Sequence, residues 1–196
     1  MLKQLLEFLL PRALYRALLV PYHFVRACIS ACSAGFPGKK LTVVLVTGTK
    51  GKSTVTEMVA AVLEAGGKKV AVSSTIHFRI GAETTPNRYK MTLPGRGFIQ
   101  RFLKDAVEAG CSAAVIEVTS ESALQSRHLF LFPDAVVFTN LQKEHLESHG
   151  GMENYFNAKF RIGKELAASS KRPRAIIANA DDAYGARFLA LPVEKH

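Results

Sequence analysis

A short loop of small and basic residues has the composition of a phosphate-binding site. Residues 47–54 read T-G-T-K-G-K-S-T. Glycines let backbone N–H groups turn toward phosphate oxygens, lysine adds positive charge, and a serine hydroxyl can bind Mg²⁺. Val46 stands where the general G-x-x-x-x-G-K-S loop has its first glycine, and an ordinary glycine-containing turn is the alternative. The predicted nucleotide-binding residues are Gly48, Thr49, Lys50, Gly51, Lys52, Ser53 and Thr54.

Two charged residues further along the chain could take part in the same chemistry. Glu117 lies near the end of an apolar run at residues 113–118. A carboxylate in that position is costly unless it is paired or binds a metal, so a structural ion pair and a Mg²⁺ site are both open. Lys159 lies in a helical pattern at residues 152–167, where spacing alone predicts a solvated side chain.

The elements that would position these residues alternate between strand and helix patterns. Residues 41–46 form an apolar, β-branched run typical of a strand buried on both faces. Residues 52–65 have helical spacing and end at two glycines. Their apolar face is predicted to hold Val55, Met58, Val59, Val62 and Leu63.

Later segments continue this alternation. Residues 99–107 and 152–167 have helical spacing, and residues 75–94 form a polar stretch that fits a hairpin or a substrate loop. Further strands are predicted at residues 70–72, 113–118, 135–138 and 175–178. Such alternation predicts an α/β fold of the P-loop type, with a mostly parallel sheet and helices on both faces. Ligands of such folds bind outside the carboxyl ends of the strands.

The N-terminal segment differs from the rest. Residues 1–38 are apolar, basic and helical in pattern, with breaks expected at Pro11 and Pro21, and a Gly/Pro cluster closes them. We therefore predict an amphipathic segment at 1–38 and one nucleotide-binding domain at 39–196. Arginines interrupt the apolar stretch, so a membrane-spanning helix is not expected. Residues 1–34 are expected either to lie on a membrane surface or to pack on the domain.

Composition narrows the class of protein. The chain has 196 residues, of which 48% are hydrophobic and 21% charged, so a folded protein is expected. A net charge of +10 fits phosphate-bearing substrates, an anionic membrane surface or nucleic acid. Nucleic acid is not expected, because zinc-finger, RNP-type and basic heptad motifs are missing. Three cysteines without a disulfide framework fit a reducing, cytoplasmic compartment.

The form T-G-T-x-G-K-S resembles the Mur ligases and their folylpolyglutamate synthase relatives. These enzymes use ATP to turn a carboxylate into an acyl phosphate, which an amine then attacks. Three later stretches are similar to Mur ligase motifs: 116–127 (I-E-V-T-S with Q-x-R), 138–150 (F-T-N-L-Q-K-E-H-L-E-S-H-G) and 152–159 (M-E-N-Y-F-N-A-K). A weaker match is M-T-L-P at 91–94. The resemblance spans about residues 41–190.

The resemblance implies roles for particular residues. Lys52 would be catalytic, and Lys159 would act as a carbamate that helps position Mg²⁺. Glu121 replaces a histidine of the family pattern. Mg²⁺ would be bound by Ser53, Glu117 and His145, and the UDP-MurNAc-dipeptide by Thr92, Thr119, Gln125 and Arg127.

The implied function is an ATP- and Mg²⁺-dependent ligase that adds an amino acid to UDP-MurNAc-dipeptide in peptidoglycan synthesis. The resemblance also implies a UDP-binding N-terminal domain and a C-terminal domain, for which this sequence has no counterpart. We therefore expect the chain alone to bind nucleotide but to ligate poorly. The alternatives are a folylpolyglutamate or poly-glutamate ligase and a non-catalytic nucleotide-binding module.

Overall fold

The computed structural model describes residues 12–89, 91–95, 97–144 and 146–196. Its strands are β1 (Thr42–Thr47), β2 (Val70–Ser73), β3 (His77–Ile80), β4 (Glu83–Pro86), β5 (Ala113–Glu117), β6 (Ala135–Phe138) and β7 (Ala175–Ala178). Its helices are α2 (Arg12–Ser33), η1 (Pro37–Lys40, a 3₁₀ turn), α3 (Lys52–Ala65), α4 (Phe98–Glu108), α5 (Ser120–Leu124), α6 (Leu146–His149), α7 (Met152–Ala168) and α8 (Gly185–Leu189).

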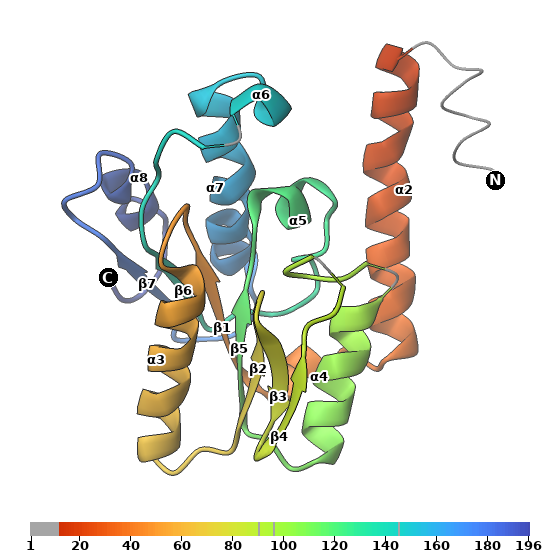
Figure 1. The fold of residues 1–196 in the computed structure, drawn as a ribbon, viewed down its shortest axis with the longest axis vertical. Coiled ribbons are helices and arrows are strands. Elements are labelled where there is room, and N and C mark those ends of the chain that lie inside the picture. The colour runs from red at the N-terminus through yellow and green to blue at the C-terminus, as the bar shows by residue number, and fades with distance from the viewer. Residues whose placement is uncertain (1–11, 90, 96, 145) are drawn as a thin grey trace.

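The strands form one seven-stranded sheet in the order β4-β3-β2-β5-β1-β6-β7 (Figure 1). The run from β2 to β7 is parallel, with β1 flanked by β5 and β6. The hairpin β3–β4 extends it in antiparallel fashion at one edge. The predicted mostly parallel α/β sheet is therefore confirmed. The polar stretch after β2 contains a hairpin, one of the two forms expected for it.

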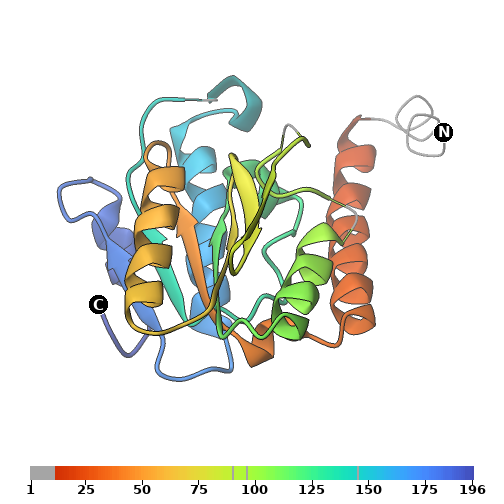
Figure 2. The ribbon, with the colours of Figure 1, turned by 60° about the horizontal axis from the view of Figure 1, so that its bottom comes forward.

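Helices cover both faces of the sheet, because neighbouring strand residues point to opposite sides. Val44 and Val46 face α3, whereas Leu45 belongs to a larger core with α4, α7 and α8. Figure 2 shows α3 in front of the strands and α7 behind them.

The buried face of α3 is narrower than predicted. Val55, Val59 and Leu63 pack on the sheet, but Met58 and Val62 are 62% and 72% exposed. A helix that covers one sheet face alone touches it along a narrow stripe, so the flanks of that stripe remain open to solvent.

The helix α2 runs beside α4 at one side of the molecule (Figure 1). The break predicted at Pro21 is wrong, since α2 continues through it from Arg12 to Ser33. A proline removes one backbone hydrogen bond, and the rest of the helix can persist around it. Ala31 is buried, and the Phe24 ring lies 5.7 Å from that of Phe130. None of the helices in the described ranges is long and apolar enough to cross a membrane.

Candidate functional site

The predicted phosphate loop connects β1, in the interior of the sheet, to α3. Gly48 has no room for a side chain, because a Cβ there would lie 2.0 Å from Thr139 Oγ1. Gly51 adopts a φ of 76°, in the left-handed region that glycine tolerates best, and α3 begins at the next residue. The N-terminus of α3 thus faces the loop, and its backbone N–H groups and dipole favour a negatively charged ligand.

The end of the neighbouring strand β6 braces this loop. The backbone N–H of Lys50 donates to Asn140 Oδ1 at 2.9 Å, and that of Thr49 donates to the Asn140 carbonyl at 2.8 Å. Thr139 Oγ1 donates to the Lys50 carbonyl at 2.8 Å, and the Gln142 N–H donates to Thr49 Oγ1 at 3.0 Å. These four hydrogen bonds tie the loop to the segment that follows β6.

An oxygen-rich pair lies between the loop and β5. Ser53 Oγ donates to Glu117 Oε2 at 2.8 Å, and Glu117 is only 2% exposed. The Thr75 N–H donates to Glu117 Oε2 at 2.9 Å, and its hydroxyl donates to Oε1 at 3.0 Å. Hydroxyl and amide groups satisfy this carboxylate, and no salt bridge involves it within the described ranges. The structural ion pair is therefore not supported.

The donor set of Ser53 and Glu117 fits Mg²⁺, which prefers oxygen ligands and usually takes one or two carboxylates together with phosphate oxygens. The third predicted ligand, His145, lies outside the described residues. In the described parts of the chain, no group of three or more His, Cys, Asp or Glu side chains is arranged for a metal.

Lys159 lies beneath the loop and is buried. It is 1% exposed, and its Nζ donates to the Gly48 carbonyl at 2.6 Å, 4.6 Å from the centre of the Tyr155 ring. Burial, reinforced by the positive charge of Lys52, lowers the pKa of Lys159 to about 7. The solvated lysine that spacing alone predicts is therefore wrong. A near-neutral pKa makes an uncharged amine available, which carbamate formation with CO₂ requires.

The two lysines of the loop differ in direction. Lys52 folds back onto the loop, so that its Nζ donates to the Thr49 carbonyl at 2.8 Å. Lys50 points outward, with 63% of its side chain exposed, and pairs with Glu144 at 3.6 Å. Thr54 is exposed on the first turn of α3. Lys52 is thus the better placed of the two for phosphate contact.

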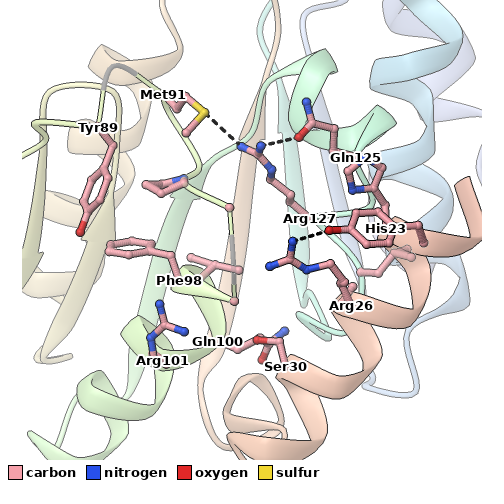
Figure 3. Close-up of a pocket in the computed structure, with 17 residues that line it drawn as sticks. His23, Arg26, Ser30, Tyr89, Met91, Phe98, Gln100, Arg101, Gln125 and Arg127 are labelled. Atoms are coloured by element: carbon pink, nitrogen blue, oxygen red, sulfur yellow. Dashed lines mark hydrogen bonds between the residues drawn. The ribbon is translucent and has the colours of Figure 1, made fainter. Parts of the chain in front are cut away.

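The four predicted substrate residues do not all line one cavity. Gln125 and Arg127 line a pocket of about 650 Å³ between α2 and α4 (Figure 3). Thr92 hydrogen-bonds Thr75 through the two hydroxyls, 2.8 Å apart. The Thr119 side chain accepts from the Ser122 N–H and caps α5, as an N-terminal cap residue does.

Two residues at this edge were missing from the predicted site. Thr75 follows β2 and bonds Glu117, while Asn140 follows β6 and clamps the loop. Both are polar residues directly beyond an apolar strand, so the strand-end rule applied to every strand would have found them.

Comparison with known proteins identifies the family of this chain. The Mur ligase middle domain matches residues 46–196. The chain belongs to the Mur ligase family. It is 40% identical over 176 residues to a UDP-N-acetylmuramyl-tripeptide synthetase of Roseiflexus sp. (strain RS-1), covering 85% of this chain and 35% of that protein. It is 41% identical over 168 residues to a UDP-N-acetylmuramoyl-L-alanyl-D-glutamate–2,6-diaminopimelate ligase of Geobacter metallireducens (strain ATCC 53774 / DSM 7210 / GS-15), covering 83% of this chain and 32% of that protein.

This Mur ligase chain thus spans about a third of the length of these relatives. A solved UDP-N-acetylmuramoyl-L-alanyl-D-glutamate–2,6-diaminopimelate ligase superposes with a TM-score of 0.64 at 27% identity, over 76% of this chain and 28% of that one. FolC from E. coli, in complex with ADP, gives a TM-score of 0.62 at 18% identity, over 87% and 46%. At this level of identity, the similarity to FolC shows a shared fold only.

Proposed function

We propose that this chain is the ATP-binding part of a ligase that joins an amino acid to UDP-MurNAc-dipeptide. The main support is the edge where the phosphate loop, the Ser53–Glu117 pair and the buried Lys159 meet. Relatives at about 40% identity carry the names of tripeptide synthetase and diaminopimelate ligase. We also propose that ATP is the nucleotide, with support from the loop and from an ADP-bound structural neighbour.

Each part of this edge has a distinct task in the proposed reaction. The loop amides and Lys52 would hold the phosphates and stabilise charge on the transferring phosphoryl group. Ser53, Glu117 and His145 would hold Mg²⁺, which would neutralise negative charge during phosphoryl transfer. Lys159 would act as a carbamate. Thr92, Thr119, Gln125 and Arg127 would contact the UDP-MurNAc-dipeptide.

The two alternatives make different predictions about ligands. A folylpolyglutamate or poly-glutamate ligase would use the same nucleotide edge, but would bind a folate or polyglutamate acceptor. A non-catalytic module would bind nucleotide and neither acceptor. The family motifs at residues 116–127 and 152–159 favour the UDP-MurNAc-dipeptide.

Acceptor binding at saturating ATP analogue tests the proposal. Calorimetry with UDP-MurNAc-L-Ala-D-Glu should give heat of binding, whereas folyl-glutamate should give none. ADP release in a single turnover, dependent on both precursor and amino acid, would add support. Binding of folyl-glutamate alone, or of neither acceptor, would favour one of the alternatives and reject the ligase proposed here.

We further propose that residues 1–34 make a peripheral membrane contact. The support comes from α2, the described part of this segment. Leu18, Val25 and Ile29 are 49%, 51% and 63% exposed and share one helical face, a pattern found in membrane-surface helices. Co-sedimentation with anionic liposomes should be lost when residues 1–34 are removed. Equal sedimentation of the shortened chain would reject this contact.

A further inference from the structure

The pocket between α2 and α4 is lined by arginines from different segments. They include Arg26 from α2 and Arg127 from the segment after α5 (Figure 3). Among the described residues that line it there is no aspartate or glutamate. Guanidinium groups gathered around a cavity of about 650 Å³ favour an anionic ligand.

Neutral groups hold two of these arginines in place. Arg26 Nη1 donates to the Tyr22 hydroxyl at 2.8 Å. Arg127 donates to the Gln125 side chain and to the Leu93 carbonyl. These bonds come from uncharged partners, so they orient the two guanidinium groups and leave each of them positively charged.

The two charges also act on each other. Burial lowers the pKa of Arg127, Glu121 opposes that change, and the nearby Arg26 lowers the pKa further. Two like charges repel each other in a cavity that no described carboxylate lines. A bound anion would relieve this repulsion.

We propose that Arg26 of α2, together with Arg127, binds an anionic group of the acceptor at the end remote from the phosphate loop. This rests on the ligase function proposed above. Phosphate and carboxylate oxygens share the chemistry that paired guanidinium groups recognise. Arg26 lies outside residues 46–196, the part that the Mur ligase middle domain matches. Acceptor recognition would therefore extend to α2.

The reacting end of the acceptor would lie at the nucleotide edge and not in the pocket. This sets the direction in which the acceptor lies. Thr92 bonds Thr75, which bonds Glu117 at the edge that would hold Mg²⁺ and phosphate. An acceptor with its reacting carboxylate at that edge would extend past Gln125 and Arg127 toward α2. The group that meets Arg26 is then either the diphosphate or a second carboxylate.

Titration of the 196-residue chain, with its phosphate loop saturated by a non-hydrolysable ATP analogue, tests this assignment. Arg26→Ala should weaken binding of UDP-MurNAc-L-Ala-D-Glu by about 10-fold or more. The precursor affinity of Arg26→Lys should fall between those of the unsubstituted chain and Arg26→Ala, because lysine keeps the charge but lacks the planar guanidinium group. Ile29→Ala, on the exposed side of the same helix, is the matched control and should bind as the unsubstituted chain does. Affinity for the ATP analogue should not change in any variant.

Fragments identify the anionic group. UDP alone should lose affinity in Arg26→Ala if the diphosphate meets Arg26, and MurNAc-L-Ala-D-Glu alone should lose it if a carboxylate does. Equal precursor affinity in Arg26→Ala and the unsubstituted chain would overturn the assignment and leave the ligase function standing. Inorganic diphosphate tests whether the anion site exists even if the proposed ligase function is wrong. If it binds in an Arg26-dependent manner while the precursor does not bind at all, the anion site stands and the ligase function fails.

Discussion

The nucleotide edge and the α2–α4 pocket satisfy their polar groups in opposite ways. At the edge, Asn140 and Thr139 bond the loop backbone, and Glu117 accepts three hydrogen bonds. In the pocket, arginines face one cavity and no carboxylate lines it in the described chain. The edge is therefore prepared for a ligand by its own hydrogen bonds, whereas the pocket retains charge that a ligand would neutralise.

This difference predicts how each region responds to substitution. A preorganised site loses affinity when a group that touches the ligand is removed, because the remaining groups are already in place. A charged pocket also responds to salt, since exposed guanidinium groups are screened.

Lys52→Ala should give the largest effect. Removal of this amine should weaken binding of a non-hydrolysable ATP analogue with Mg²⁺ by about 100-fold or more, because it deletes charge-assisted bonds to phosphate. Calorimetry would measure the affinity. Lys68→Ala is the matched control, since Lys68 is exposed beyond the C-terminal end of α3, at the opposite end of the helix from the loop, and it should bind normally. Undiminished affinity in Lys52→Ala would remove the phosphate-loop assignment.

Lys159→Met should change how stability depends on pH. With its pKa lowered from 10.5 to about 7, Lys159 disfavours folding at low pH, where it is protonated while buried. This cost is complete below pH 7, shrinks between pH 7 and 10.5, and vanishes above. The stability advantage of Lys159→Met should therefore fall by about 1 kcal/mol per pH unit across that window.

Denaturant unfolding at several pH values would measure this slope, with Lys164→Met, exposed on the same helix, as control. A slope equal to that of the control would contradict the burial of a titrating amine. The carbamate proposed for Lys159 has its own readout. In ¹³C-bicarbonate, a carbamate NMR signal should grow as pH rises through 7 and be absent in Lys159→Met.

Much of the edge could be predicted because its residues follow the strands directly. Apolar runs located β1, β5 and β6. The loop follows β1, and Glu117 is the last residue of β5. The position of Lys159 depended on resemblance, since the sequence pattern alone placed it in solvent. Its burial comes from α7 packing beneath the loop, which local spacing does not encode.

The pocket could be predicted less well, because it joins distant segments. Arg26 and Arg127 are a hundred residues apart, and only the packing of α2 along α4 brings them to one cavity. The expected break at Pro21 hid the length of that helix. Met58 and Val62 show the same limit, since helical spacing gives a face but not the width of the surface that covers it.

Glu117→Gln should have a smaller effect than Lys52→Ala and should appear only with Mg²⁺. The amide keeps the shape but loses the negative charge that favours a divalent cation. Mg²⁺ should then enhance nucleotide affinity by about 10-fold less than in the unsubstituted chain. Glu144→Gln, whose carboxylate lies by the outward Lys50, is the control. Equal Mg²⁺ enhancement in Glu117→Gln and Glu144→Gln would exclude Glu117 as a metal ligand.

Thr75→Val should give the smallest effect, on communication between the two regions. The Thr75 hydroxyl donates its proton to Glu117, so the Thr92 hydroxyl must donate to Thr75 Oγ1. This chain of bonds ties a loop near the pocket to the carboxylate of the metal pair. Loss of the hydroxyl should reduce the gain in precursor affinity caused by the ATP analogue by about 3- to 10-fold. Because thermodynamic coupling is reciprocal, the gain in analogue affinity caused by the precursor should fall by the same factor. Thr75→Ser keeps the hydroxyl and should retain the coupling. If valine leaves the coupling intact, the edge and the pocket bind their ligands independently, and the bond through Thr75 positions the loop alone.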